Sequence, residues 1–326
     1  QTCALPIFQT TIAGTIVAGS LTASADNSTL AGEEYAAKAT ANGSTGSLFV
    51  GVDATRSTNV NTGKVLTTVA DDADVTVTTG DAGISAANNI SQSATADSAA
   101  GGLIAAGFAR ATSSSNTSVR VQVEDDASVV AEAGDVNIDA QGLDDNFAVA
   151  TAGSGGLIAG AAAQATTGNQ SDTAVAIGDG VELEADETLA IAAQHTAVFD
   201  SVTNSLTAAV VGASGAYAVN TVDAQLGVTV GDSDLTGGAM DISARNVINK
   251  NVDGVNGYNV NAGSGGVIGA PAASSATTIA NVAAIDIGAG ASLSTTGADD
   301  NLLRLSAVSD VNAVDKVKLD SGGAIA

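Results

Sequence analysis

Hydrophobic positions in this chain alternate with polar or very small ones over short stretches. Val119–Val123, Val136–Ala140, Leu189–Ala193 and Leu226–Val230 each carry an apolar residue at every second position. This spacing is typical of a half-buried β-strand, because successive side chains of a strand point to opposite faces. Acidic or glycine-containing turns such as Glu124–Asp126 separate the alternating stretches, so the pattern predicts a chain of short β-strands.

A longer periodicity is superimposed on this alternation. Gly101–Ala105 reads Gly-Gly-Leu-Ile-Ala, and near copies follow at Gly155–Ala159 and Gly265–Gly269. With the first large apolar residue of each copy as a marker, the markers fall at 48, 103, 157, 210, 267 and 324, which indicates a repeat protein. We expect a partial N-terminal repeat over 8–47, then repeats over 48–102, 103–156, 157–209, 210–266 and 267–323 and a truncated repeat that completes 48–326.

These repeats predict an all-β fold, a parallel β-solenoid of the right-handed β-helix type. A short strand cannot bury its apolar face alone, whereas coils stacked on one another form one continuous narrow core. The spacing of the markers fits either two coils of ordinary size or one wide coil with a long Gly/Ala arm. At about 4.8 Å between neighbouring strands, roughly a dozen coils would form a rod on the order of 60 Å long.

In the Gly/Ala arm, one copy has a composition that favours helix and another has a composition that favours strand. Gly156–Ala165 is rich in alanine, which is the best helix former. The corresponding Val210–Val219 is β-branched and interrupted by glycine. Because one fold must accommodate every copy, we predict strand throughout the arm.

Composition and charge narrow the core and the partners. Aromatic residues make up 2% of the chain and Trp is absent, so small aliphatic side chains must fill a thin core. The formal net charge of −25 argues against nucleic acid and anionic membrane surfaces as partners, because no basic stripe is present to neutralise phosphates. No apolar run reaches the ~18–20 residues of a transmembrane helix, so we expect no membrane insertion.

The ends of the sequence need separate treatment. Residues 1–7, Gln-Thr-Cys-Ala-Leu-Pro-Ile, match the in-frame translation of a sequencing-library adapter, so we interpret them as a scar and exclude them from the fold. Without them the chain has no cysteine, which is compatible with secretion through an oxidising compartment. Met240 is the only methionine, and we expect the sequence to be a fragment of a longer protein.

Paired acids are the only candidates for a metal site. Carboxylate-rich turns are the type of site that Ca²⁺ uses, but the glycine-rich nonapeptide that would make the signal specific is missing, so we favour solvated turns and no cofactor. The candidate calcium ligands are Asp125, Asp126, Asp144, Asp145, Asp299 and Asp300.

No catalytic constellation is visible in the sequence. His195 is the only histidine and directly follows a predicted strand, so we expect it at the surface or in a turn. The ten basic residues and the few aromatic ones are scattered, whereas a sugar-cleaving site needs clustered carboxylates and aromatic platforms. We therefore predict that the chain is not an enzyme.

The Ser-Gly-Gly-Leu-Ile-Ala arm, with later strands of the Val136–Ala140 type, resembles repeats of leukotoxin-type filamentous adhesins of Gram-negative bacteria. The resemblance runs from about Leu48 to the end and rests on composition and spacing. It implies a large exoprotein secreted by an autotransporter or two-partner route and displayed extracellularly at the bacterial cell surface. It also implies an outer-membrane transporter outside this sequence and a receptor on host cells or other surfaces.

Three functions from different classes stay open. A stalk or passenger segment of an adhesin predicts repeats without a unique polar cluster. A carbohydrate-active β-helix enzyme predicts acids, bases and aromatics that converge on one face. A calcium-stabilised secreted module predicts carboxylates stacked along one edge. We favour the adhesin segment.

Overall fold

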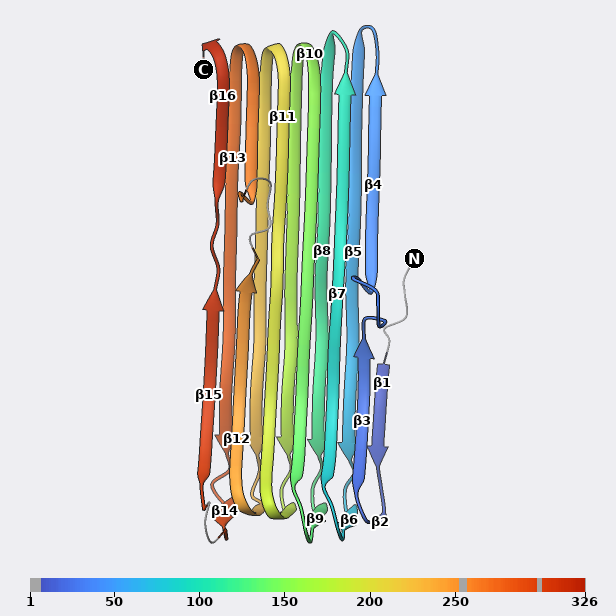
Figure 1. The fold of residues 1–326 in the computed structure, drawn as a ribbon, viewed down its shortest axis with the longest axis vertical. Helices are drawn as coiled ribbons and strands as arrows, with labels where there is room; N and C mark the ends of the chain where they lie inside the picture. Colours follow the sequence, from blue (N-terminus) through green and yellow to red (C-terminus); the bar gives the residue numbers. More distant parts are fainter. Residues whose placement is uncertain (1–6, 252–256, 298–300, 326) are drawn as a thin grey trace.

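The computed structural model describes residues 7–251, 257–297 and 301–325, and this part of the chain is all-β (Figure 1). Each coil of the chain has three parts (Figure 1). An ascending wall runs from the base to the tip, a descending wall runs from the tip back to the base, and a short base strand follows. Strands of the ascending wall are β3 (Leu21–Ser28), β4 (Ala37–Gly46), β7 (Ala82–Gly101), β12 (Asp234–Lys250), β15 (Leu303–Asn312) and β16 (Val317–Ile325). Strands of the descending wall are β1 (Ile7–Ile12), β5 (Val50–Val69) and β8 (Ile104–Val123).

Three longer strands run up one wall, around the tip and down the other wall. They are β10 (Val136–Ile177), β11 (Glu182–Val230) and β13 (Val260–Ile287). Separate base strands are β2 (Thr15–Ala18), β6 (Asp74–Val77), β9 (Ser128–Ala131) and β14 (Ser292–Thr295), and the first residues of β11 and β12 continue the same row. The predicted strands and the β-conformation of the Gly/Ala arm are confirmed, but the strands are much longer than the alternation suggested.

All pairings between these strands are parallel and join successive turns of the chain. Val136 pairs with Ala82 in the preceding turn and with Leu189 in the following one. The partners are separated by close to the spacing of the sequence markers, so the register joins equivalent positions of neighbouring turns. It also places Val50 opposite Ile104, so that Phe49 rather than Leu48 occupies the position of Leu103.

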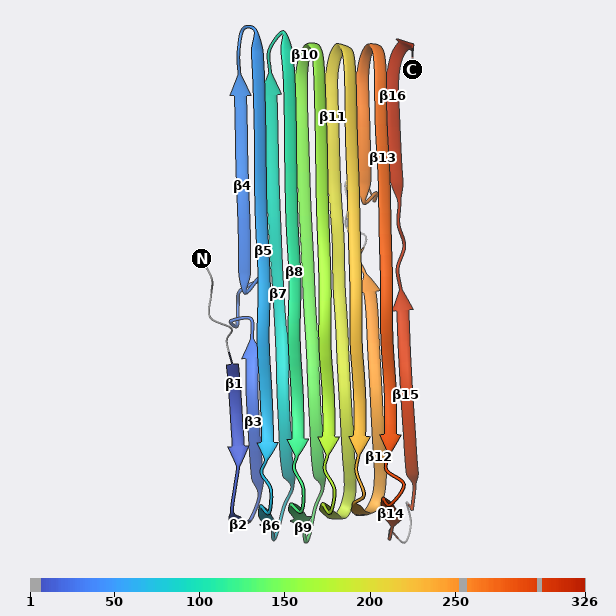
Figure 2. The same cartoon turned by 180° about the vertical axis from the view of Figure 1, so that it is seen from behind.

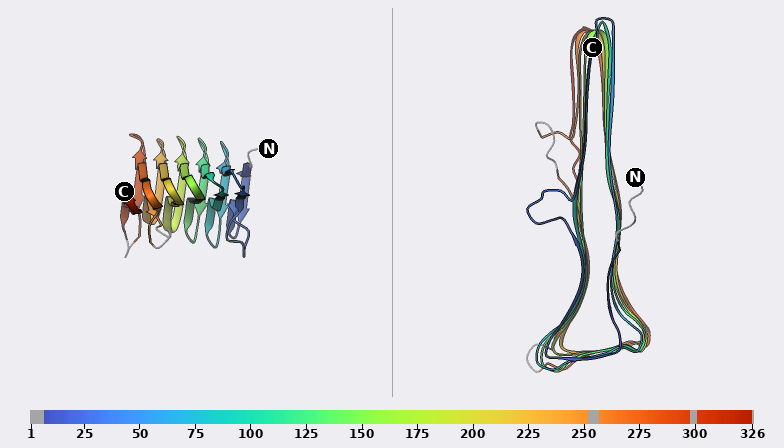
Figure 3. Two further views of the ribbon diagram at one scale, coloured as in Figure 1. Left: turned by 90° about the horizontal axis from the view of Figure 1, so that it is seen from above. Right: turned by 90° about the vertical axis from the view of Figure 1, so that its right-hand side faces the viewer.

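Each turn is one wide coil, because paired residues are a full sequence period apart rather than half a period. Figure 2 shows the long strands side by side from the rear, and Figure 3 shows successive turns that follow one outline, a broad base with a narrow arm. Of the two coil sizes that the marker spacing left open, the structure has the one wide coil with a long Gly/Ala arm and not a rod of a dozen small coils. A strand of 20 residues such as β8 spans about 66 Å, whereas each added coil contributes only about 4.8 Å, so the molecule is longest along its strands.

Large aliphatic side chains fill the base. Val136, Ile138, Leu183, Leu189 and Ile191 are all buried there, and their partners in the coils above and below are apolar as well. Stacking places each such side chain directly over its counterpart, so the base core is a continuous column rather than a closed ball. The size of Val, Ile and Leu holds the walls apart and accounts for the broad base.

Alanine fills the middle of the arm in the coils that contain β7, β8 and β10. Ala94, Ala109, Ala148, Ala163 and their neighbours form a buried cluster in which every member is alanine. Methyl groups allow the two walls to approach closely, which agrees with the thin core expected from the composition. Between this alanine core and the base lies a zone of inward polar side chains: Asn88, Gln92, Ser113, Ser115, Thr117, Asp144, Asn146, Thr167, Asn169, Ser171, His195 and Asn246.

The recurring glycine pair has a steric cause at the tip. A Cβ on Gly156 would lie 2.1 Å from the carbonyl oxygen of Gly102, and one on Gly266 would lie 1.6 Å from that of Ala209. Neighbouring coils therefore approach so closely at the tip that a side chain at these positions would collide with backbone. The Gly-Gly-Leu-Ile motif marks the place where the chain turns from one wall to the other.

The column Leu189, Met240 and Leu303 offers a matched test of the core. Leu189 is fully buried between two coils, whereas Leu303 in the last coil is 42% exposed. Leu189→Ala should lower the free energy of unfolding by about 2–5 kcal/mol, and Leu303→Ala by less than about 1.5 kcal/mol. Urea denaturation followed by circular dichroism measures both, and equal losses would contradict the stacked core.

Candidate functional site

The polar zone contains the most unusual group of side chains in the interior. Asn27, Asn88, Gly142, His195 and Asn246 occupy one column of the ascending wall, one residue in each coil. Strand alternation turns this column inward, so His195 is only 1% exposed. The amide of Asn27 donates to Oδ1 of Asn88 at 2.7 Å, which begins a ladder of polar contacts between coils.

Asp144 and His195 form the centre of this zone. Asp144 is 0% exposed, and its Oδ2 accepts the hydroxyl of Thr117 at 2.8 Å and lies 3.3 Å from Nε2 of His195. The other ring nitrogen, Nδ1, lies 3.1 Å from Oδ1 of Asn246. A Cβ on Gly142 would lie 2.9 Å from Cδ2 of His195, so the missing side chain leaves room for the ring.

Two sequence-based expectations about this cluster were wrong. His195 was expected at the surface or in a turn, and Asp144 in a solvated turn, but both lie on strand interiors and are buried. The alternation of inward and outward side chains around Asp144 and His195 continues that of the flanking strand residues. Their hydrogen-bond partners come from neighbouring coils and are distant in the sequence. A buried polar group needs such a partner, and a single repeat does not display it.

The order of contacts in this cluster differs from that of a nucleophile relay. In such a relay the histidine lies between the carboxylate and the hydroxyl. Here the hydroxyl of Thr117 donates to the carboxylate, and the second ring nitrogen of His195 faces an amide. The arrangement gives both ring nitrogens of His195 a partner in a neighbouring coil, whereas Oδ1 of Asp144 and Nδ2 of Asn246 have no hydrogen-bond partner among the described residues.

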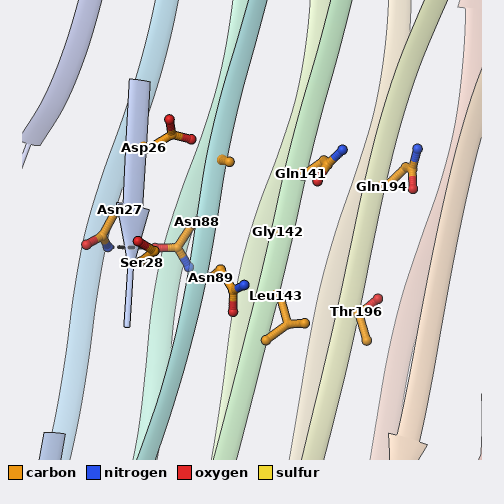
Figure 4. Close-up of a pocket in the computed structure, with 11 residues that line it drawn as sticks. Asp26, Asn27, Ser28, Asn88, Asn89, Gln141, Gly142, Leu143, Gln194 and Thr196 are labelled. Atoms are coloured by element: carbon orange, nitrogen blue, oxygen red, sulfur yellow. Dashed lines mark hydrogen bonds between the residues drawn. The ribbon is translucent and has the colours of Figure 1, made fainter. Parts of the chain in front are cut away.

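Asn27, Asn88 and Gly142 of this column also line a polar hollow of about 400 Å³ (Figure 4). Its outward side chains include Asp26, Asn89, Gln141, Gln194 and Thr196, from β3, β7, β10 and β11. Gln141 and Gln194 are register partners and repeat the same amide from one coil to the next. The lining holds neither an aromatic nor a basic side chain, so it offers hydrogen bonds without a platform for a sugar ring.

A second patch on the same wall brings acids and bases together. Arg245 pairs with Asp310 at 3.0 Å, and Arg304 lies 3.7 Å from Asp241, each pair joining neighbouring coils. These residues look scattered along the sequence, because a separation of more than one repeat hides the contact. The hollow that they line also contains no aromatic side chain, and both ion pairs are largely exposed, so each contributes little stability.

Three side chains have raised pKa values, namely Asp139 and Asp145 on β10 and Tyr35 between β3 and β4. Burial raises the pKa of Asp139, against the opposing hydrogen bond from Gln141. Burial also raises the pKa of Asp145, where a hydrogen bond from Ser91 opposes it and the nearby charge of Glu34 adds to it. Burial, followed by the hydrogen bond and charge of Glu34, raises the pKa of Tyr35 to about 12.

The candidate calcium ligands do not converge. Asp125 and Asp126 lie in the exposed turn between β8 and β9, whereas Asp144 and Asp145 are adjacent strand residues that point to opposite faces. Asp299 and Asp300 lie outside the described residues. Among the residues that the structure describes, no group of three or more metal-ligating side chains is close enough to hold an ion.

The turn carboxylates have a structural role instead. Oδ1 of Asp125 accepts the backbone N–H of Asp179 at 2.9 Å, and Oδ1 of Asp179 accepts that of Asp232 at the same distance. Oδ1 of Asp232 continues the series to the N–H of Gly290 at 2.8 Å. Stacked carboxylates along one edge are therefore present, but they satisfy backbone donors at the corner where the strand ladder is interrupted.

No protein-family model, curated protein or solved structure matches this chain. In the described ranges no helix has the length and apolar character of a transmembrane span.

The Asp144–His195 contact can be tested by a double-mutant cycle. His195→Ala should lower the free energy of unfolding by about 2–3 kcal/mol, because Asp144 and Asn246 each lose a buried partner. Asp144→Ala should have a similar effect, and the double variant should lose less than the sum by at least about 1 kcal/mol. Gln194→Ala, one residue away on the outer face, should stay within about 0.5 kcal/mol of the parent. Additive losses would mean that the two side chains act independently.

Asp139 supplies a prediction for pH. The pKa of Asp139 in the folded state lies above the ordinary value of 3.8. The free energy of unfolding therefore increases as the pH falls through this folded-state pKa, and the increase is complete below the pKa of the unfolded state. Asp139→Asn should therefore raise the melting temperature at pH 7, and its advantage should shrink as the pH falls towards 4. Melting curves across this range measure the difference, with the exposed turn variant Asp71→Asn as the control. A constant advantage at every pH would contradict the burial of the charge.

Proposed function

We propose that this chain is a structural stalk or passenger segment of a secreted or cell-surface filamentous adhesin, built as a right-handed β-solenoid with one wide coil in each repeat. The observation that carries the proposal is the column-wise stacking: in-register partners such as Val136 and Leu189 come from successive coils and are of similar type. Such an assembly extends by adding coils, and each coil contacts only its neighbours. That is the property a stalk requires.

The interior and the surface both support a structural role. The buried polar contacts join neighbouring coils, and the turn carboxylates bind backbone amides of the next coil. The resemblance of the glycine-rich arm to filamentous adhesins supplies the adhesin part of the proposal. Under this proposal the chain lies at the extracellular surface of a Gram-negative bacterium, with an outer-membrane transporter and a surface receptor as its partners.

A carbohydrate-active β-helix is the second candidate, because acids and bases do meet on one wall at Arg245, Asp310, Arg304 and Asp241. These carboxylates are engaged by guanidinium groups, and the hollow lacks an aromatic platform. A general acid and a nucleophilic or basic carboxylate with room for a sugar between them are required for glycoside cleavage. The stalk is therefore the better-supported function.

Single-molecule pulling along the stacking axis tests the stalk. A chain held by its two ends should lose one coil at a time, because the coils are joined only to their neighbours. Each step should release one repeat, or roughly 180–190 Å of contour length. Leu189→Ala should lower the force of at least one step, and Leu303→Ala should leave the internal steps unchanged. A single cooperative rupture, or steps of half this length, would contradict the proposed stalk.

A further inference from the structure

The outer face of the descending wall carries a shallow hollow of about 540 Å³ near the tip. Phe108 and Tyr217 line it and are 43% and 44% exposed, and its floor consists of small residues such as Ala162. The two rings are far apart in the sequence, and the stacking of coils brings them to one surface. Unlike the hollows of the ascending wall, this one therefore offers aromatic rings to a ligand.

The ring of Tyr217 lies over Gly215. A Cβ on Gly215 would lie 3.0 Å from Cε2 of the ring, so the absence of a side chain there makes room for it. Gly215 is consequently buried, although its neighbours Ala213 and Tyr217 on the same face are exposed. A ring that is held against the wall in this way loses little conformational entropy when a ligand binds.

Tyr217 shares a column with two arginines. Arg56, Arg110, Gln164 and Tyr217 are register partners in four successive coils, so their side chains form one row across the wall. Neither Arg56 nor Arg110 takes part in the arginine ion pairs of the described residues, and Nε of Arg110 has no hydrogen-bond partner among them. Like charges opposite each other on neighbouring strands are destabilising, and a bound anion would offset this repulsion.

The charge of this part of the wall is opposite to that of the whole chain. Every second residue from Val52 to Val60 points outward, as do the register partners of these residues in the following coils. Arg56 and Arg110 are the only charged residues at these positions, whereas the chain has a formal net charge of −25. The surface therefore complements a ligand with one or two negative charges, because the acidic body would repel a dense polyanion.

Asp53 also lines the hollow, but its carboxylate does not face the ligand. Strand alternation places the side chain of Asp53 on the inward face, together with those of the buried Thr55 and Ser57. Its Oδ2 accepts the backbone N–H of Ala99 on the opposite wall at 3.2 Å. The positive character of the outer face is thus retained.

We propose that this surface binds an acidic glycan, a chain of sugars of which one or two carry a carboxylate. The rings of Phe108 and Tyr217 would pack against the apolar faces of sugar rings, and a guanidinium group holds a carboxylate through two parallel hydrogen bonds. The amide of Gln164 can both donate to and accept from sugar hydroxyls. Aromatic surface with a few convergent polar groups is the usual composition of a ligand site.

The register supports a glycan that lies along the stacking axis. Phe108 and Tyr217 are two coils apart, or about 9.6 Å across the strands, so an extended glycan would meet both rings. Arg110 is the next outward residue after Phe108 on β8, which places its guanidinium beside a sugar that packs on that ring. The proposal rests on the adhesin function for its biological context and names the class of receptor.

Ligand-observed NMR with the full chain tests the site. The probes are sialyllactose, a trisaccharide with one carboxylate, and lactose, its neutral part. The chain should bind sialyllactose at least about 10-fold more tightly than lactose, because a hydrogen-bonded charge pair adds to the contact with the rings. Salt at 1 M NaCl should weaken the binding of sialyllactose and leave that of lactose unchanged.

Variants assign the binding to the named residues. Arg110→Gln and Tyr217→Ala should each raise the dissociation constant for sialyllactose at least about 10-fold. Lys64→Gln removes a charge from the same wall outside the hollow, and Tyr217→Phe keeps the ring, so both controls should stay within about 2-fold of the parent. Unchanged circular dichroism establishes that the variants are folded.

Four results would overturn the glycan site. They are a parent chain that does not bind sialyllactose up to about 10 mM, equal affinities for sialyllactose and lactose, an Arg110→Gln chain that binds as the parent does, and tighter binding of single-stranded oligothymidylate through the same residues. None of them changes the coil-by-coil extension expected under force. Failure of the glycan site and failure of the stalk are therefore distinguishable.

Discussion

The stacking of long parallel strands in register is the constraint on which the rest of the structure depends. Every residue of a wall lies directly over an equivalent residue of the neighbouring repeat, so a side chain is accommodated only if its counterparts in the next coils tolerate it. The interior is consequently organised in columns. Large aliphatic columns hold the base open, and alanine columns bring the two walls together in the arm. The outline of each coil follows from side-chain volume along the strand.

The same constraint explains why polar side chains occupy the interior. Large apolar side chains such as Phe199 and Ile248 occupy only part of the arm interior, and the polar side chains that point inward need hydrogen-bond partners. Asn, Ser and Thr meet this need by hydrogen bonding to the coil above or below, as Asn27 does with Asn88. Asp144 and His195 extend the arrangement to ionisable groups. Buried polar contacts of this kind are costly when one partner is lost, so they favour one register over its alternatives.

The base corner and the tip of the arm meet different structural requirements of the same coil. At the base corner, carboxylates such as Asp179 accept the N–H of the next coil where the strand ladder is interrupted. At the tip, glycine removes the Cβ where backbones nearly touch, and the following aliphatic residues have no interior to enter. The row of exposed aliphatic residues at the tip, such as Leu103 and Ile104, is therefore a direct product of the narrow turn. Its apolar surface and the acidic body give the molecule two chemically distinct regions.

Strand conformation, parallel stacking and the acidic turns of the Glu124–Asp126 type were determined by the sequence, because alternation and glycine placement act locally and recur with every repeat. The β-conformation of the Ala-rich arm could be predicted in the same way, by comparing Gly156–Ala165 with its β-branched counterpart. The size of the coil and the burial of Asp144 and His195 were decided only by the tertiary structure. Both depend on contacts between residues about a whole repeat apart, and a lone histidine or a pair of acids looks the same in a turn as in a strand. The strand register decides which residues become partners in neighbouring coils, and this register is set only when the coils stack.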